Sequence, residues 1–267
     1  MKLYVLLLAA PQLSVNFARD SGRIDDYMVE CRYNEAITLL NTLLRLADSS
    51  SQQYEIVPLL VKSVTLAVEI GRLDEAEREL AAAAVAAREQ FPSRSAAIAR
   101  ERAALLLAKR DFPQARAAAH NAVKLSRQSG YYKIRIAYAQ SLEALAALEL
   151  NDTEAAAKLM QEALKSVPKK TSKQYFHAPR ILYAAARVAS RQGDHATAEA
   201  HCRRGLAMHP AARDAALGHL TLAEIHFAAS NIDAGRQAAE TSLRLTRELF
   251  GDQHQDAARA RLLLAQP

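Results

Sequence analysis

The sequence predicts an all-α fold, an α-solenoid built from about six antiparallel helix-turn-helix repeats. Alanine makes up about a fifth of the 267 residues, and the chain has only 8 Gly and 8 Pro. Ala, Leu, Arg, Glu, Gln and Lys favour helices because they lose little rotamer entropy there. No stretch alternates apolar and polar residues with the period of two that marks a strand. In addition, a short polar turn recurs along the chain, which indicates stacked helical hairpins.

The turns divide the chain into hairpins, each with one helix before the turn and one after it. In chain order they read ECRYNEAI, IGRLDEAE, AKRDFPQA, ELNDTEAAA, RQGDHATAE and ASNIDAGR. One anchor residue marks each turn: Cys31, Gly71, Arg110, Asn151, Gly193 and Ser230. Successive anchors are 40, 39, 41, 42 and 37 residues apart. The first hairpin follows the pattern least well, because Gly22 interrupts its leading helix. After the sixth hairpin we expect a final helix over residues 255–266.

Small residues recur at fixed distances from the anchors. Five positions after each anchor stand Ala36, Ala76, Ala115, Ala156, Ala198 and Gly235. Seven positions before the last four anchors stand Ala103, Ala144, Ala186 and Ala223. Small side chains let the two backbones of a hairpin approach closely. Larger apolar residues such as Leu40, Leu80 and Met160 are then expected to fill the space between one hairpin and the next.

This pattern resembles the tetratricopeptide repeat, which has a small residue in the first helix, a turn, an early alanine in the second helix and a closing proline. The segment LYAAARVASRQGDHATAEAHCRRGLAMHP carries the best match, through Ala186, Gly193, Asp194, Ala198 and Pro210. The resemblance covers about residues 17–250. The spacing exceeds the family's 34 residues, and SLRLTRELFGDQHQDAARARLLLA is similar to the longer repeats of kinesin light chains and bacterial relatives. The resemblance implies a right-handed solenoid and a non-enzymatic scaffold that binds proteins.

The first 18 residues, MKLYVLLLAAPQLSVNFA, allow two interpretations. Lys2 and the apolar run after it resemble the start of a secretory signal. Against cleavage, Asn16 stands two positions before Ala18, and Pro11 would follow a cut after Ala10. The alternative is an apolar segment that packs on the first helices. We therefore divide the chain into this segment and a solenoid domain over 19–267, and favour a cytoplasmic location over export. No other stretch is apolar for the 18 or more residues that would span a membrane.

Patterns typical of catalysis or cofactor binding are missing from the sequence. No two glycines lie within ten residues of each other, so no glycine-rich phosphate loop can form. The metal motif HExxH and the nucleophile motif GxSxG are absent. Cys31 and Cys202 belong to no CxxC pair, and Cys202 is expected to be a small buried hydrophobe. His195 and His201 flank the fifth turn, where surface histidines are a better interpretation than a metal site. We expect no catalytic residue, metal, cofactor or small-molecule substrate.

The charge is distributed unevenly along the chain. Residues 1–90 carry a net charge of −4, residues 91–204 of +11 and residues 205–267 of −1, which sum to the overall +6. Within the basic middle, residues 165–194 hold seven Lys and Arg and no acid before Asp194. Lys169, Lys170 and Lys173 are expected to be a solvated connector between hairpins, whereas the arginines that follow them fall on a predicted helix.

In tetratricopeptide domains the first helix of each repeat lines a concave groove that binds peptides, so the resemblance implies the same here. Positions relative to the anchors give the candidate partner-binding residues Arg100, Tyr138, Ser141, Arg180, Tyr183, Arg187 and Arg191. The last four lie at i, i+3, i+7 and i+11, on one helical face. Arg grips carboxylates in bidentate fashion, and Tyr offers a flat apolar body with a polar tip. The expected partner is an acidic peptide or protein segment; the alternative is that Arg merely solvates an alanine-rich helix.

Two further function classes stay open. The basic middle, with aromatic residues in GYYKIRIAY and KTSKQYFH, is compatible with nucleic-acid binding, although no base-reading code per repeat is visible. The chain is also compatible with the sensory or regulatory part of a larger signalling protein. We favour the protein-interaction scaffold over both.

Overall fold

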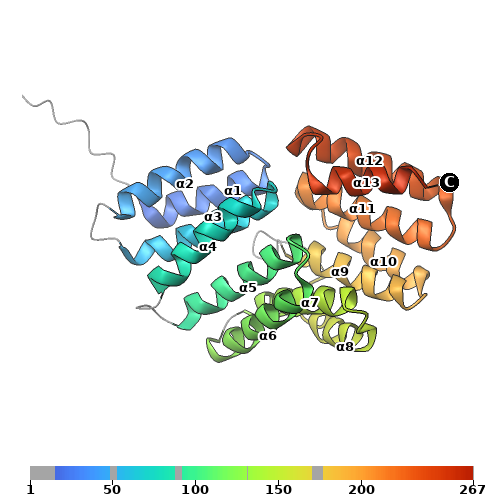
Figure 1. The fold of residues 1–267 in the computed structure, drawn as a ribbon, viewed down its shortest axis with the longest axis horizontal. Helices are drawn as coiled ribbons and strands as arrows, with labels where there is room; N and C mark the ends of the chain where they lie inside the picture. The colour runs from blue at the N-terminus through green and yellow to red at the C-terminus, as the bar shows by residue number, and fades with distance from the viewer. Residues whose placement is uncertain (1–15, 49–52, 88–91, 131, 170–176, 267) are drawn as a thin grey trace, which may run out of the picture.

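The computed structural model describes residues 16–48, 53–87, 92–130, 132–169 and 177–266. Within these ranges the chain forms thirteen α-helices, one short 3-10 helix at Gln53–Glu55 and no strand (Figure 1). The α-helices are α1 (Phe17–Val29), α2 (Tyr33–Asp48), α3 (Ile56–Glu69), α4 (Leu73–Ala87), α5 (Pro92–Ala108), α6 (Phe112–Gln128), α7 (Lys133–Glu149), α8 (Thr153–Leu164), α9 (Ala178–Arg191), α10 (His195–Leu206), α11 (Ala212–Ala228), α12 (Ile232–Phe250) and α13 (Gln255–Leu264).

The helices pack as six consecutive hairpins, from α1 with α2 to α11 with α12, and α13 follows as a single helix. The predicted all-α repeat architecture is therefore confirmed. The final helix ends at Leu264, two residues before the predicted end. Phe17 and Ala18 belong to α1, so the predicted division after residue 18 falls inside a helix. The signal-like residues 1–15, and the predicted connector lysines Lys170 and Lys173, lie outside the described residues. Among the described residues, no helix is long and apolar enough to cross a membrane.

Each anchor residue ends the first helix of its hairpin in the left-handed backbone region. The six anchors share positive φ values: 57° at Cys31, 78° at Gly71, 62° at Arg110, 62° at Asn151, 83° at Gly193 and 59° at Ser230. In the fourth turn the N–H of Asn151 donates to Leu148 (3.0 Å) and that of Asp152 donates to Ala147 (2.9 Å). This pair of bonds is a Schellman motif, and the other five turns have it too. The repeat period read from the sequence is thus the distance from one Schellman motif to the next.

The residue after the anchor begins the second helix of the hairpin. The carboxylates of Asp111, Asp152 and Asp194 accept hydrogen bonds from the backbone N–H groups of Gln114, Ala155 and Thr197, three residues on. An acceptor at this position satisfies one of the N–H groups that the first helical turn leaves unpaired. The anchor and the residue after it therefore end one helix and cap the next. Each turn is short as a result, and the hairpins have similar geometry.

Replacing Ser230 by glycine is expected to raise the free energy of unfolding by about 0.5–1 kcal/mol. The left-handed conformation costs a residue with a side chain about 1–2 kcal/mol, and the extra entropy of glycine in the unfolded chain cancels part of the gain. Ser230 is exposed, so the change removes little else. Urea unfolding would measure it. Ala229, with φ of −86°, is the control, because Ala229→Gly relieves no strain and is expected to destabilise. Equal effects of both changes would contradict this account of the turns.

The small residues of the repeat pattern are buried, as predicted. The ten residues at the two recurring positions are fully buried, and all but Gly235 are alanines with no exposed surface. Leu40, Leu80 and Met160 are buried too, with 2%, 9% and 3% of their surface exposed. Cys202 has no exposed surface and donates a hydrogen bond from Sγ to the carbonyl of Gly218 (3.1 Å), and burial raises the pKa of its thiol to about 12. It is a core residue, as expected.

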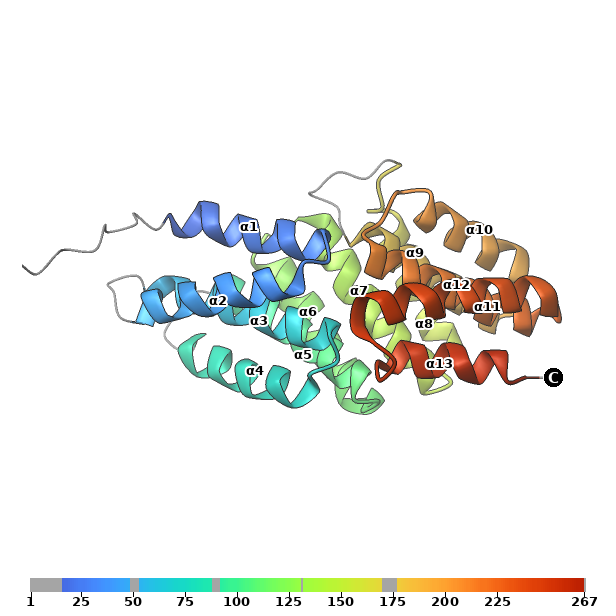
Figure 2. The same ribbon diagram turned by 90° about the horizontal axis from the view of Figure 1, so that it is seen from above.

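The solenoid curves until its first and last hairpins touch. In both views the ends of α1 and α3 that carry the turns approach the facing ends of α11, α12 and α13 (Figures 1 and 2). The rings of Tyr33 and Phe250 pack with centroids 5.4 Å apart, and the His254 ring stacks on Phe250 at 4.5 Å. The Nε2 atom of His254 lies 3.3 Å from the carbonyl oxygen of Glu69. Helix ends meet here, rather than the sides of helices.

Candidate functional site

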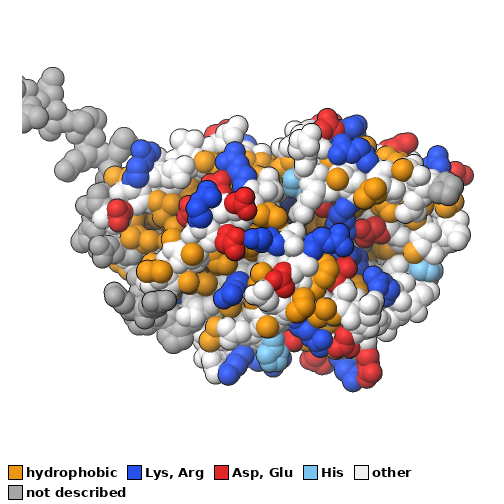
Figure 3. All heavy atoms as spheres, viewed as in Figure 1, with side chains coloured by type: hydrophobic (Ala, Val, Ile, Leu, Met, Phe, Trp, Pro, Cys, Tyr) orange, Lys and Arg blue, Asp and Glu red, His pale blue; other side chains and the backbone are white. Residues whose placement is uncertain are grey.

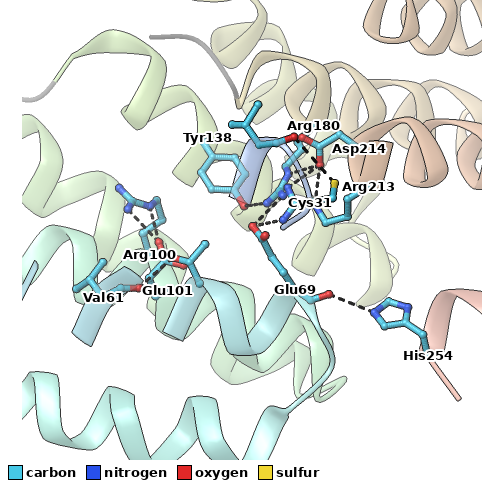
Figure 4. A network of polar contacts seen from close by, with 12 residues as sticks. Cys31, Val61, Glu69, Arg100, Glu101, Tyr138, Arg180, Arg213, Asp214 and His254 are labelled. Atoms are coloured by element: carbon cyan, nitrogen blue, oxygen red, sulfur yellow. Dashed lines mark hydrogen bonds and ion pairs between the residues drawn. The ribbon is translucent and has the colours of Figure 1, made fainter. Parts of the chain in front are cut away.

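The inner side of this curve carries arginines from the first helices of the third, fifth and sixth hairpins. They are Arg100 of α5, Arg180, Arg187 and Arg191 of α9, and Arg213 of α11; we call them the arginine face. Arg213 was not among the predicted site residues. Figure 4 shows Arg180 and Arg213 pointing toward Glu69 and Asp214, with Tyr138 beside them. Helical geometry explains the alignment within α9, because residues at i, i+7 and i+11 share one face.

Arg180 stands at the centre of a buried polar network. Its Nε donates to Asp214 (2.8 Å), its Nη2 to Glu69 (3.1 Å) and its Nη1 more weakly to the Tyr138 hydroxyl (3.4 Å). Only 15% of the Arg180 side chain is exposed, and Asp214 and Glu69 are buried further, at 6% and 9%. All three directions of the guanidinium are therefore taken by groups from α3, α7 and α11.

Arg213 binds the same two carboxylates. Its Nη2 lies 2.8 Å from Oδ1 of Asp214, its Nη1 contacts Oε1 of Glu69, and 15% of its side chain is exposed. Asp214 is thus held between two guanidiniums, and so is Glu69. Two arginines facing two carboxylates form a compact cluster without net charge. Burial nevertheless raises the pKa of Asp214, so the guanidiniums beside it do not fully offset its loss of hydration.

The other arginines of the face are paired more locally. Arg187 lies 2.7 Å from Glu149 and 3.6 Å from Glu224, with 27% of its side chain exposed. Arg100 pairs with its neighbour Glu101 at 2.9 Å. Arg191 is exposed, and its Nη1 lies 3.5 Å from the Asn151 amide oxygen. Accessibility therefore rises along α9, from Arg180 through Arg187 to Arg191.

Two predicted groove residues are buried inside the fold instead. Tyr183 is 2% exposed and packs against Gly205 and Gly218 of the next two helices. Ser141 is 1% exposed, and its hydroxyl donates to the Tyr138 carbonyl in its own helix (2.7 Å). Neither side chain offers a surface to a partner in this structure. The reason is that α7 and α9 are packed by neighbouring hairpins on more than one side, so residues on several of their faces are buried.

Tyr138 is also buried, at 7%, but it supports the arginine face directly. Its ring stacks on the His177 ring with centroids 4.0 Å apart and planes 8° apart. Burial, together with the positive charges of Arg100, Arg180 and Arg135, holds the pKa of His177 well below its ordinary value of 6.5. A neutral histidine between arginines avoids adding another positive charge to this face.

The stability of the protein is therefore expected to fall as the pH drops below about 6.5. A histidine that stays neutral when folded binds a proton only after unfolding, so acid favours the unfolded state by up to about 1.4 kcal/mol per pH unit. His177→Phe retains a ring beside Tyr138 and should make this dependence shallower. Part of it should remain, because burial also lowers the pKa of His201, His219 and His254. Urea unfolding between pH 7 and 5 measures both slopes; equal slopes would contradict the role of His177.

Across the face as a whole, positive and negative side chains alternate. In Figure 3 the Lys and Arg side chains interleave with Asp and Glu across the middle of the molecule, between areas of hydrophobic side chains. The arginines come from the basic middle of the sequence or its border, whereas Glu69 and Glu224 come from its acidic ends. Folding thus pairs some acids of the chain ends with arginines of the basic middle.

A separate hollow lies away from this face, between α4, α5 and α6. Its volume is about 500 Å³, and its walls are formed mainly by Ala84, Ala87, Ala99 and Ala118, with Arg102 among the lining residues. Its lining is mostly apolar, and its polar members are Ser95, Arg102, Gln114 and Asn121. Among the described residues, no three His, Cys, Asp or Glu side chains cluster as a metal site would require.

Known proteins share the architecture but little sequence. No protein-family model matches the chain, and no curated protein matches it. Among solved structures, BtubC (BKLC) from P. vanneervenii is 17% identical, with a TM-score of 0.54 over 89% of this chain and 93% of that one. NprR in complex with its cognate peptide NprX is 13% identical, with a TM-score of 0.60 over 94% and 72%. The apo form of RapI is 8% identical, with a TM-score of 0.58 over 93% and 69%.

The chain has the fold of a tetratricopeptide-type helical repeat protein. The resemblance read from the sequence is thereby confirmed at the level of the fold. Within this tetratricopeptide-type solenoid the predicted residues Arg100, Tyr138, Arg180 and Arg187 come together on one side, and Arg191 extends it. Sequence reasoning missed Glu69, Arg213 and Asp214, although Glu69 stands two positions before its anchor, as Glu149 does.

Proposed function

We propose that the chain is a non-enzymatic protein-interaction scaffold whose arginine face binds an acidic segment of a partner protein. One observation carries the proposal: arginines of the third, fifth and sixth hairpins already bind carboxylates on this face, at 2.7–2.9 Å in the closest pairs. Such short, charge-assisted contacts are those that a partner's Asp or Glu would make. Arg187 and Arg191, the more accessible members, are the residues that a partner would meet first.

The similar structures support the same class of function. NprR was solved in complex with its cognate peptide NprX, on a repeat fold that this chain matches over most of its length. That likeness concerns the fold alone, so the acidic nature of the partner rests on the arginines of this chain. A peptide-responsive regulatory role, of the sensory kind considered above, is the second candidate, and the NprR complex favours it.

Binding of a fluorescein-labelled oligoglutamate peptide, followed by anisotropy at low salt, tests the proposal. The variant Arg187→Glu/Arg191→Glu is expected to bind at least about ten-fold more weakly, which corresponds to about 1.4 kcal/mol. Arg203→Glu/Arg204→Glu is the matched control, because it makes the same charge change on the exposed face of α10 in the same hairpin. An oligoglutamine peptide reports binding that does not depend on charge. Equal losses in both variants would show a general charge effect and would overturn the proposed face.

A further inference from the structure

The carboxylate of Glu69 belongs to the second hairpin but is bound by the fifth and sixth. Glu69 is the last residue of α3, and its Oε1 lies 3.1 Å from Nη2 of Arg180 and also contacts Nη1 of Arg213. Glu69 and Arg180 are 111 residues apart in the sequence. We call this set of ion pairs the closing contact. It joins the two ends of the curved solenoid across its inner side (Figure 4).

An equivalent glutamate elsewhere in the repeats shows that this arrangement is specific. Glu149 occupies the same position, two residues before its anchor, and pairs with Arg187 of the following hairpin, 38 residues away. A glutamate in this position can therefore link adjacent hairpins. Glu69 instead skips two hairpins and reaches α9 and α11, which it can do only while the ends of the solenoid are together.

The rest of the junction between the two ends is small. Among the residues that the structure describes, it includes the Tyr33–Phe250 ring contact, the His254 ring beside Glu69 and Phe250, and Cys31, which lies near Ala212 and Asp214. The helices meet at their tips, so no long apolar seam holds them. Charged contacts of low exposure are strong only while each partner is present, and losing one partner is costly. The closing contact is therefore a main link between the two ends.

If Glu69 leaves, the chemistry of the site changes. Arg180 and Arg213 then share one carboxylate, that of Asp214, so two positive charges face one negative charge. An outside carboxylate would restore the balance, in the place and with the contacts that Glu69 has now. Asp214 would remain between the two guanidiniums and hold them in position.

We infer that Arg180 and Arg213 form a carboxylate-binding site that Glu69 occupies in this structure, and that an acidic side chain of the partner replaces Glu69 as the two ends separate. This inference rests on the proposed function, because it places one acidic group of the same partner. It adds that the protein carries its own competitor for the site. Binding and opening are then two sides of one equilibrium, since a ligand that binds only the open form shifts the population toward it.

Glu69→Gln tests the inference, with Glu162→Gln as the control for the loss of one negative charge, because Glu162 is exposed and pairs with Lys165 rather than with an arginine of the face. Opening is measured without ligand, as the rate at which a maleimide modifies Cys31. Burial raises the pKa of the Cys31 thiol in the closed form, and opening should expose it and increase the reactive thiolate. Cys202 is the internal control, because it is fully buried in the core and should stay unreactive unless the chain unfolds. The oligoglutamate peptide then reports on affinity.

In Glu69→Gln we expect faster modification of Cys31 and at least about five-fold tighter oligoglutamate binding, at the low end of known couplings between sites. In Glu162→Gln we expect neither change. Unchanged Cys31 reactivity, or opening without tighter binding, overturns the inference. If Cys202 also reacts, Glu69→Asp is the second variant, since it keeps the charge but is too short to reach both arginines. Weaker binding by Arg187→Glu/Arg191→Glu, measured in parallel, shows whether the proposed function stands when the inference fails.

Discussion

Replacing Arg180 by methionine is expected to lower the free energy of unfolding by about 3 kcal/mol, one of the two largest effects predicted for a single change in this chain. Methionine fills similar space but supplies no charge, so Asp214 and Glu69 lose their shared partner while they stay buried. Breaking a buried ion pair typically costs about 3–5 kcal/mol, because the remaining charge has lost both its water and its partner. Arg213 still contacts both carboxylates, which places the expected effect at the lower end.

The same change at Arg187 is the control for Arg180→Met. Arg187 has the same residue type, the same helix and an ion pair of similar length, 2.7 Å to Glu149, but 27% of its side chain is exposed. Water screens such a pair, so Arg187→Met should cost no more than about 1 kcal/mol. Urea unfolding followed by circular dichroism measures both. If Arg187→Met were as costly as Arg180→Met, burial would not be what makes the Arg180 network matter.

The repeat architecture could be predicted because it depends on local chemistry. A left-handed residue, a following cap and small residues at fixed distances all act within one hairpin, so their spacing in the sequence reports them directly. Asn151 shows this well: its φ of 62°, the cap at Asp152 and the fully buried Ala156 follow one another in six residues. The same signals found all six hairpins.

The partners of the arginines could not be predicted, since they depend on how far the solenoid curves. Each hairpin adds a small rotation, and the sum over several hairpins decides whether Glu69 reaches Arg180, 111 residues away. No local pattern encodes that sum. The sequence therefore placed the arginines of α9 on one helical face, but it did not reveal their acidic partners within the chain. The only related signal in the sequence was the excess of acidic residues near its two ends.

The burial of Tyr183 and Ser141, two residues of the predicted site, has a different cause. The resemblance implied that the first helix of each repeat is exposed along one inner face. In the middle of the solenoid, α9 contacts α7, α8, α10 and α11, so most of its circumference is covered. Tyr183 lies three positions after Arg180 on the same helix, yet its ring enters the interior between α10 and α11. Its role in this structure is packing.

Gly218→Ala is expected to lower the free energy of unfolding by about 2–3 kcal/mol, because the space beside Gly218 is already filled. A Cβ there would lie 2.7 Å from Cδ2 of Leu206 and 2.7 Å from both Cζ and the hydroxyl of Tyr183. These atoms belong to two different helices, and Tyr183 is only 2% exposed, so the ring has no open side to move into. Overpacking of this kind typically costs about 1–3 kcal/mol. Unfolding in urea, with the slope checked for constancy, measures the loss.

Gly22→Ala separates this clash from the general effect of adding a methyl group. Gly22 is also helical, but it is exposed and has nothing within 4 Å of its missing Cβ. Alanine favours a helix over glycine by about 1 kcal/mol, so Gly22→Ala should stabilise the protein. The opposite signs of the two Gly→Ala changes would then isolate the packing term. If Gly218→Ala were stabilising too, the contact between α9, α10 and α11 would be looser than the structure has it.

A double-mutant cycle with Tyr183 identifies which side chain fills the space. Leucine at position 183 lacks both the Cζ and the hydroxyl that a Cβ on Gly218 would meet. The cost of Gly218→Ala should therefore be smaller in a Tyr183→Leu background, and the difference is the interaction energy of the pair. Tyr183→Leu should also leave oligoglutamate binding unchanged as long as the protein stays folded. A packing role predicts coupling to Gly218 without any effect on the ligand, whereas a binding role for Tyr183 predicts the reverse.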